Sequence, residues 1–199
     1  FEEQMHYLKT QGYHVVNLRQ LLEFISLRRQ LPPRSVLLAF DDGYRSFRQH
    51  AYPVLKRLGF TARLFVYTDY VGAGRNALSW TELRELAAEG FDVQAHSKTH
   101  ADLRRGAGES AEQYERRMQA ELAQPNALLR QHLGQASPTL AYPYGYWDDA
   151  LARGEQAAEA ARRAGDDWHI GAFSNAIGSM LANRGDYESA KKHYERAVE

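Results

Sequence analysis

The chain has 199 residues, 44% of them hydrophobic, which suits one sizeable core, or one domain with a small appendage, and argues against disorder. Its 25 basic residues balance 25 acidic ones, so no basic surplus favours nucleic acid as a partner, and no apolar run is long enough to span a bilayer. Because cysteine is absent, disulfides, thiolate nucleophiles and cysteine zinc sites are excluded, and any metal must be held by histidine and carboxylate side chains.

The first part of the chain alternates helical patterns with short apolar runs. The spacing of apolar residues predicts helices over 2–12 and 18–27, the second followed by a Pro-Pro break. Residues 35–40 form a continuous apolar run bounded by breakers, which predicts a buried parallel strand. This strand ends abruptly in an Asp-Asp-Gly sequence at residues 41–43.

The alternation continues along the chain to about residue 142. Strands alternating with helices predict a parallel sheet or barrel, in which chemistry gathers at the carboxyl ends of the strands. In chain order, the further elements are a helix over 46–58, a strand over 63–67, a helix over 80–89 with a Ser79–Glu82 capping box, a strand over 91–95, a long helix over 109–133 and a short fourth strand over 139–142.

Polar clusters directly follow three of the predicted strands, at 41–42, 96–100 and 142–145. We therefore expect their side chains to meet at one end of the sheet. Two of the clusters suit a metal ion. His96 and His100 are four residues apart, a spacing that places two imidazoles on one face of a helical turn.

Adjacent carboxylates after a buried strand are unfavourable unless a cation relieves their repulsion. Taken alone, Asp41 and Asp42 could be a solvated turn, and the two histidines could be unrelated surface residues. Taken together, Asp42, His96 and His100 make a two-histidine, one-carboxylate set that leaves a coordination position open for water. In this interpretation Asp41 serves as the general base.

Three ordered motifs resemble those of the polysaccharide deacetylases. Ala39-Phe40-Asp41-Asp42-Gly43-Tyr44 is similar to their first motif, and His96-Ser97-Lys98-Thr99-His100 matches the second, His-Ser-x-Thr-His. Tyr142-Pro143-Tyr144-Gly145 looks like the third. The resemblance covers residues 1–149 and is nearer to the poly-N-acetylglucosamine deacetylases than to the chitin deacetylases.

The resemblance implies a role for each motif. Asp41 would be the catalytic base, and Asp42, His96 and His100 would hold a divalent metal, commonly zinc. The backbone N–H of Tyr144 would stabilise the oxyanion. Substrate contacts are expected from Tyr142, Pro143, Tyr144 and Trp147, with Trp147 and Tyr146 as candidates for stacking on a sugar ring.

The sequence also departs from the family pattern. Ala39 replaces the usual threonine, and Ala141 stands where many relatives carry an arginine that orients the base. The later motifs, which supply an apolar acetyl pocket and a general acid, are not found. His169, in an Asp-Asp-Trp-His sequence that superficially echoes them, is better interpreted as a residue at the start of a helix.

After residue 149 the sequence becomes alanine-rich and helical in pattern. Residues 166–199 number 34, the period of a tetratricopeptide repeat, and their pattern fits that helix–turn–helix unit. The prediction is thus an α/β fold with two parts. A partial, distorted parallel β/α barrel covers residues 1–149, and a helical, tetratricopeptide-like tail covers residues 150–199 and offers a surface for a protein partner.

The predicted function is a metal-dependent hydrolase that removes N-acetyl groups from a polysaccharide containing N-acetylglucosamine. Two alternatives stay open: an O-acetyl esterase using the same site, and a catalytically impaired glycan-binding scaffold whose tail binds a protein. Because the chain starts at Phe1, we expect a fragment, and no signal peptide is visible. A periplasmic or extracellular location is favoured over the cytoplasm.

Overall fold

The computed structural model describes residues 1–146. The chain divides into two compact units, Phe1–Gln94 and Ala95–Glu199, and the boundary falls inside strand β5 (Asp92–Ala95). The predicted tetratricopeptide-like tail, Trp147 and His169 lie outside the described residues. No helix within residues 1–146 combines the length and apolar character that crossing a bilayer requires.

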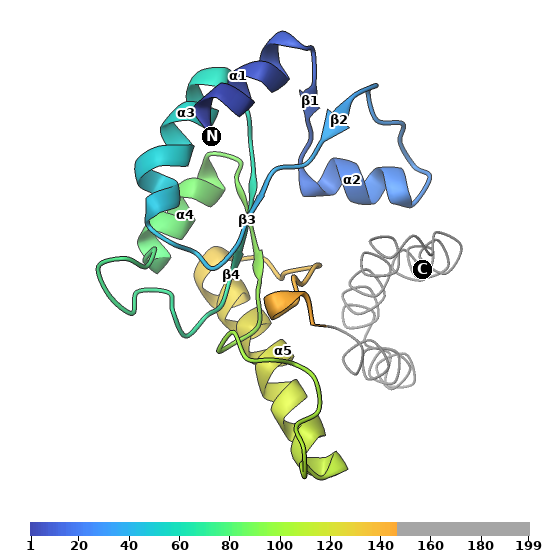
Figure 1. Cartoon of the computed structure of the whole chain (residues 1–199), viewed down its shortest axis with the longest axis vertical. Coiled ribbons are helices and arrows are strands. Elements are labelled where there is room, and N and C mark those ends of the chain that lie inside the picture. Colours follow the sequence, from blue (N-terminus) through green and yellow to red (C-terminus); the bar gives the residue numbers. More distant parts are fainter. Residues whose placement is uncertain (147–199) are drawn as a thin grey trace. The chain divides into compact units, whose positions relative to one another are not determined.

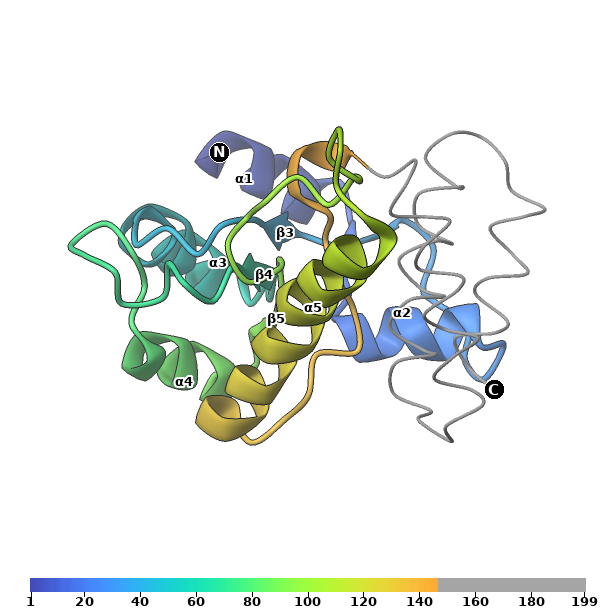
Figure 2. The same cartoon turned by 90° about the horizontal axis from the view of Figure 1, so that it is seen from below.

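Short parallel strands and helices make up the first unit. In both views α3 and α4 lie on one side of strands β3 and β4, and α2 lies on the other (Figures 1 and 2). The elements before β5 are α1 (Glu2–Thr10), β1 (His14–Val15), α2 (Leu18–Ile25), β2 (Ser35–Val36), β3 (Ala39–Phe40), the π-helical turn η1 (Phe47–Ala51), α3 (Tyr52–Leu58), β4 (Arg63–Val66) and α4 (Trp80–Ala88).

The strands within residues 1–146 form two sheets. β1 pairs in parallel with β2, and a second sheet has the order β3-β4-β5, in which β3 and β4 are parallel. All four residues of β4 are buried, as is usual for a parallel strand covered on both faces. Fully buried aliphatic side chains complete this core: Leu55, Leu64, Val66, Leu78, Leu83, Leu86 and Val93.

The prediction of one buried strand over 35–40 is wrong, because this stretch is shared between two partners. Ser35 pairs with His14 in one sheet, whereas Ala39 pairs with Arg63 in the other. The stretch is also only partly buried. An apolar run indicates an extended segment, but it does not specify which neighbours supply the hydrogen bonds. By contrast, the predicted capping box of Ser79 and Glu82 at the start of α4 is confirmed.

The described part of the second unit, residues 95–146, contains the long helix α5 (Ala111–Leu133), close to the predicted range. A capping box between Ser110 and Gln113 begins this helix, and Gly134, with a φ of 74°, ends it. The helix packs through a buried cluster of Leu103, Tyr114 and Met118, against which Leu122, Leu140 and Tyr142 lie.

The predicted fourth strand over 139–142 is wrong. Only an isolated parallel bridge joins Leu140 to Ala95, and the Ala141 amide donates to the Ala95 carbonyl at 3.2 Å. Pro138 and Pro143 flank the segment and have no N–H to donate, so the ladder cannot extend in either direction. The chain instead enters a 3-10 turn over Pro143–Gly145.

Candidate metal centre

The Asp-Asp-Gly sequence forms a tight, strained turn directly after β3. The Gly43 amide donates to the Asp41 carbonyl at 3.0 Å, and Asp42 between them has a φ of 71°. This matches a γ-turn of the positive-φ type, which is rare for a non-glycine residue. Gly43 itself has a φ of 78°, and a Cβ there would lie 3.0 Å from Cγ1 of Val66. Glycine at this position therefore allows β4 to lie close behind the turn.

Residues 75–78 hold this turn in place. The Leu78 amide donates to the Gly43 carbonyl at 3.0 Å, and the Arg45 amide donates to the Asn76 carbonyl at 2.7 Å. The Arg45 side chain adds an ion pair to Glu82 at 3.2 Å. Burial alone would raise the pKa of Glu82, but the hydrogen bonds from Ser79 and the charge of Arg45 outweigh it and lower the pKa. These hydrogen bonds and the ion pair thus hold the turn that carries Asp41 and Asp42 in place.

His96 and His100 lie in a loop rather than on a helical turn, so the predicted reason for their proximity is wrong. Their rings are nevertheless adjacent, with centroids 4.8 Å apart. Ser97 and His100 both adopt positive φ, 68° and 61°, and the His100 amide donates to Oγ of Ser97 at 3.0 Å. Left-handed backbone at these two positions folds the loop back on itself, which brings the imidazoles together.

Glu121, which belongs to none of the three motifs, connects this loop to α5. Its carboxylate accepts the amides of Lys98 and Thr99 at 3.0 and 2.9 Å and the Thr99 hydroxyl at 2.7 Å. Glu121 is only 5% exposed. A sequence signal existed, since Glu121 follows Tyr114 and Met118 at helical spacing and so falls on the buried face of α5. A carboxylate on such a face requires fixed donors.

The imidazole of His96 is oriented by the backbone of Ala141, directly before the third motif. Nδ1 of His96 lies 2.9 Å from the Ala141 carbonyl oxygen, and a carbonyl can only accept. The contact therefore favours the tautomer with its proton on Nδ1, which leaves the Nε2 lone pair for a metal ion. His96 is 3% exposed, so its ring is held in a protein environment rather than in bulk water.

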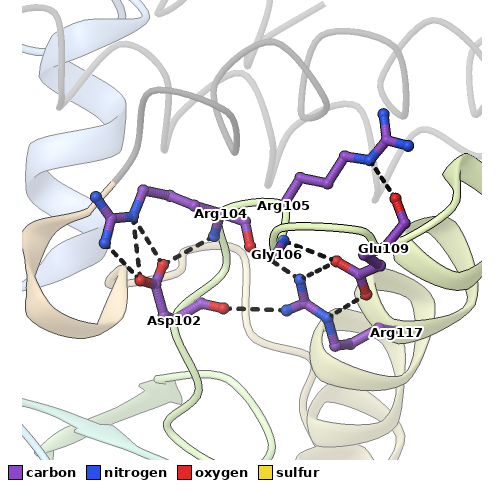
Figure 3. A pocket seen from close by; sticks show the side chains of 6 residues that line it. All are labelled: Asp102, Arg104, Arg105, Gly106, Glu109 and Arg117. Atoms are coloured by element: carbon purple, nitrogen blue, oxygen red, sulfur yellow. Dashed lines mark hydrogen bonds and ion pairs between the residues drawn. The ribbon is translucent and has the colours of Figure 1, made fainter.

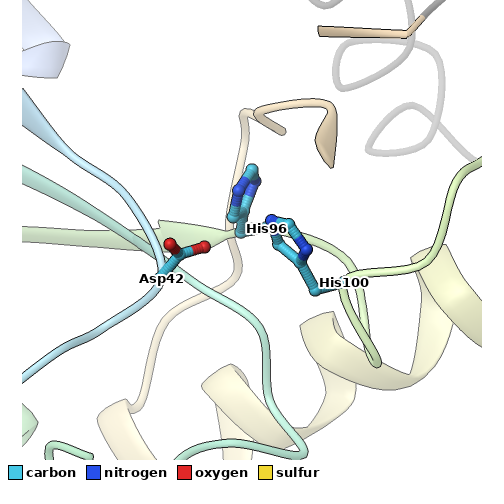
Figure 4. Close-up of side chains that lie close together, drawn as sticks. All are labelled: Asp42, His96 and His100. Carbon is cyan, nitrogen blue, oxygen red and sulfur yellow. The ribbon is translucent and has the colours of Figure 1, made fainter. Parts of the chain in front are cut away.

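The predicted ligands come together. One ligand atom from each of Asp42, His96 and His100 lies within 4.8 Å of the others, and Figure 4 shows the three side chains pointing toward one another. Two imidazole nitrogens and one carboxylate oxygen are a donor set that divalent transition metals accept. This cluster is consistent with a divalent metal site, and the residues present fit such an ion.

Backbone strain is concentrated in the three motifs. Among residues 1–146, six non-glycine residues have positive φ, and four of them are Asp42, Ser97, His100 and Tyr144. Such conformations persist only where surrounding contacts impose them, and they tend to gather at functional sites. Sequence patterns gave no sign of this strain.

The remaining predicted residues occupy different environments. Asp41 is exposed and borders a cavity of about 390 Å³ that is also lined by Phe40, Tyr44 and His50. Tyr142 packs on the core of the second unit, where burial raises the pKa of its hydroxyl, and Pro143 is buried. Tyr144 is 61% exposed, and its ring meets that of His100 edge to face at 4.6 Å.

The loop that follows His100 is held by an ion-pair network around a cavity of about 500 Å³ (Figure 3). Arg117 donates to both oxygens of Glu109 at 2.8 Å and to the carbonyls of Asp102 and Arg104. These hydrogen bonds from Arg117, followed by one from the Gly106 amide, lower the pKa of Glu109 to about 2.

The sequence profile of the family described as polysaccharide deacetylase matches residues 28–163. The chain belongs to the polysaccharide deacetylase family. The match continues past residue 149, so the predicted domain boundary there stays a prediction.

Individual members of the polysaccharide deacetylase family resemble the chain over most of its length. YxkH of Bacillus subtilis is 28% identical over 149 residues, covering 75% of this chain and 50% of that protein. The poly-beta-1,6-N-acetyl-D-glucosamine N-deacetylase of Staphylococcus aureus strain MSSA476 is 27% identical over 156 residues, covering 75% and 53%. The chain thus spans about half the length of the curated relatives it matches.

Solved structures share its α/β fold with parallel strands. IcaB from Ammonifex degensii matches with a TM-score of 0.64 and 29% identity, over 73% of this chain and 65% of that one. The Streptococcus pyogenes deacetylase PplD matches with a TM-score of 0.68 over 76% of this chain and 65% of that one, and its 24% identity supports the fold alone. Closure of the strands into a distorted barrel stays a prediction.

Proposed function

We propose that this polysaccharide deacetylase family member removes N-acetyl groups from a polysaccharide that contains N-acetylglucosamine. The observation that carries the proposal is the convergence of Asp42, His96 and His100 within 4.8 Å. The substrate class is supported by the Staphylococcus aureus relative, which is named for action on poly-beta-1,6-N-acetyl-D-glucosamine. That relative is about twice as long as the matched segment, so the substrate is part of the proposal.

Zinc is the ion that best suits the proposed ligands. Zn²⁺ binds imidazole nitrogen and carboxylate oxygen, and catalytic zinc sites commonly have three protein ligands with one position left open. The Nδ1 contact of His96 with the Ala141 carbonyl supports a ligating Nε2. A divalent ion held there would polarise the acetamide carbonyl and lower the pKa of water.

Asp41 is proposed as the general base. It directly follows β3, its side chain is exposed, and the strained turn fixes it beside the ligand Asp42. In the proposed reaction Asp41 accepts a proton from the water that attacks the acetamide carbon. The C–N bond then breaks, acetate leaves, and the sugar amine takes up a proton.

The backbone amide of Tyr144 is proposed to donate to the developing oxyanion. The two backbone hydrogen bonds of its turn are donated by the amides of Gly145 and Tyr146, and neither uses the Tyr144 amide. A donor fixed by the backbone needs no reorganisation as charge develops on the carbonyl oxygen. The positive φ of Tyr144, 60°, is part of what sets the direction of this N–H.

The test is acetate release from N-acetylglucosamine oligomers, measured with and without added Zn²⁺, in three proteins. We expect wild type to release acetate in a zinc-dependent manner. Asp41→Asn keeps bound zinc but loses about a hundredfold or more in rate, the usual contribution of a general base. Asp42→Asn, the matched amide substitution one residue later, instead loses zinc affinity.

Two results would contradict the proposed activity, and a third would contradict the role of Asp41. No acetate release from wild type that binds zinc and glycan normally would leave the impaired glycan-binding scaffold as the interpretation. Acetate release from acetylated xylan, with none from N-acetylglucosamine oligomers, would identify an O-acetyl esterase. Equal rates in wild type and Asp41→Asn would remove Asp41 from the mechanism.

A further inference from the structure

A cavity of about 390 Å³ lies beside Asp41, and the described residues that line it all belong to the first unit. Phe40 and Leu64 line it from β3 and β4, and Phe47 and Ala51 line it from η1. Phe47, Ala51 and Leu64 are no more than 6% exposed. The wall of the cavity is therefore apolar and is part of the packed core, where side chains keep fixed positions.

Contacts between aromatic rings fix the part of this wall that is nearest to Asp41. The ring of Phe40 meets that of Phe47 edge to face, with centroids 4.8 Å apart, and that of Phe1 at 5.8 Å. Phe47 in turn meets Phe91 edge to face at 5.7 Å. Such pairs are stabilising beyond the area they bury. They hold Phe40 in place, and with it the start of the turn that carries Asp41.

Polar side chains border the same cavity where it meets solvent. Asp41, Tyr44, Ser46 and His50 are all exposed, and all four line it. Ligand sites commonly combine an apolar lining with a few polar groups that orient the ligand. This arrangement suits a molecule whose alkyl part enters the cavity while its polar part stays beside Asp41.

The cavity is much larger than the methyl group of an acetamide requires. A methyl group is similar in size to a water molecule, whose share of liquid volume is about 30 Å³. An acetyl group alone would thus leave most of the 390 Å³ unfilled. A longer acyl chain would fill more of the cavity, and each additional methylene group that it buries strengthens binding about fourfold.

We propose that this cavity receives the alkyl chain of N-acyl groups longer than acetyl, such as N-butyryl, on glucosamine units of the polysaccharide. This inference rests on the proposed function, because it takes Asp41 as the general base. Water adds to the acyl carbon and gives a proton to Asp41. The C–N bond then breaks, butyrate leaves, and the sugar nitrogen takes up both protons of the water, one of them from Asp41. The alkyl chain contributes binding and takes no part in these steps.

Binding of the free carboxylates tests the cavity without turnover. Calorimetry compares acetate with butyrate, the two leaving groups, on the wild-type protein in the presence of zinc. We expect butyrate to bind about tenfold more tightly, because it buries two more methylene groups. Equal affinity for the two carboxylates, including no detectable binding of either, would overturn the proposal.

Ser46→Phe fills the cavity from its exposed border. The added ring should remove the preference for butyrate and leave acetate binding nearly unchanged. Gln49→Phe is the matched control, because Gln49 is an exposed residue of η1 outside the described lining of the cavity. It should leave both affinities unaltered. If Ser46→Phe weakened acetate and butyrate equally, or if Gln49→Phe acted like Ser46→Phe, the cavity would not be the site of the alkyl chain.

Hydrolysis gives the second measurement. Wild type should cleave N-butyrylglucosamine oligomers with a kcat/KM at least equal to that for N-acetylglucosamine oligomers, because the additional binding is kept in the transition state. Ser46→Phe should lower kcat/KM for the N-butyryl oligomers about tenfold and leave that for the N-acetyl oligomers within about twofold.

The outcome is separable from that of the proposed function. Tighter binding of butyrate that Ser46→Phe removes, in a protein that hydrolyses neither oligomer, would support the cavity and contradict the deacetylase activity. Acetate release from the N-acetyl oligomers, with no butyrate release and no tighter binding of butyrate, would do the reverse.

Discussion

Nδ1 of His96 lies 2.9 Å from the carbonyl oxygen of Ala141, 45 residues further along the chain. The contact joins the second motif to the residue directly before the third through a backbone atom, so the side chain at position 141 does not take part in it.

The first prediction tests this contact. Ala141→Pro removes the amide that donates to the Ala95 carbonyl and shifts the Ala141 carbonyl, so it should weaken zinc binding about tenfold, as loss of an orienting partner does for metal-bound histidines. Ala141→Ser keeps the backbone unchanged and should bind zinc like wild type. Zinc titration with a competing chelator measures both, and similar affinities in the two variants would contradict the role of the carbonyl.

The second prediction concerns Glu121. Glu121→Gln exchanges a carboxylate oxygen that accepts hydrogen bonds from the loop for an amide nitrogen that cannot accept any. The variant should lose about 2 kcal/mol of stability, the usual value for a hydrogen bond to a charged group, and should bind zinc about tenfold more weakly. Urea denaturation and zinc titration give the two values.

Glu115→Gln is the control for this prediction, because Glu115 lies on the exposed face of the same helix. It should change stability by less than about 0.5 kcal/mol and leave zinc affinity unaltered. If Glu121→Gln and Glu115→Gln changed stability and zinc affinity equally, the hydrogen bonds of Glu121 to the loop would have no special role.

The third prediction compares two glycines with nearly the same backbone conformation. Gly43 has a φ of 78° and Gly72 a φ of 77°, but only at Gly43 would a Cβ meet another atom, Cγ1 of Val66 at 3.0 Å. Gly72→Ala should cost about 1 kcal/mol through left-handed strain alone. Gly43→Ala should cost about 1 to 3 kcal/mol more, because overpacking adds to that strain, and should also weaken zinc binding by moving Asp42. Urea denaturation measures the loss of stability in each variant. Equal losses of stability would show that the Val66 side chain moves aside without a free-energy cost.

The fourth prediction concerns pH. The hydrogen bonds from Arg117 lower the pKa of Glu109 from the usual 4.5 to about 2 in the folded protein. A lowered folded pKa means that the ion pair contributes its stability above pH 4.5 and loses it as the pH falls toward about 2. Amide hydrogen exchange in residues 102–109 should therefore accelerate over that interval. Glu109→Gln should exchange faster at neutral pH and show no such transition, and a wild-type loop insensitive to pH would contradict the role of the ion pair.

Local sequence patterns predicted the helices well and the strands less well. The capping box predicted at Ser79 is a local signal, and α4 begins where that residue places it. The helix α5 (Ala111–Leu133) falls within the predicted range of 109–133. Residues 35–40 and 139–142 are apolar and extended, but strand pairing depends on partners elsewhere in the chain. Their division into β2 and β3, and the single bridge at Leu140, could not be read from the segments themselves.

The sequence by itself determined which residues could hold a metal ion. Without cysteine, only histidine and carboxylate side chains remain, and the places of Asp42 in the first motif and of His96 and His100 in the second singled them out. Only the tertiary structure decided how they are held: by left-handed backbone at Asp42, Ser97 and His100, by Glu121 and by the Ala141 carbonyl. The physical reason is distance along the chain. Ligand identity follows from side-chain chemistry, which is local, whereas orientation depends on hydrogen bonds between residues 22 to 45 positions apart.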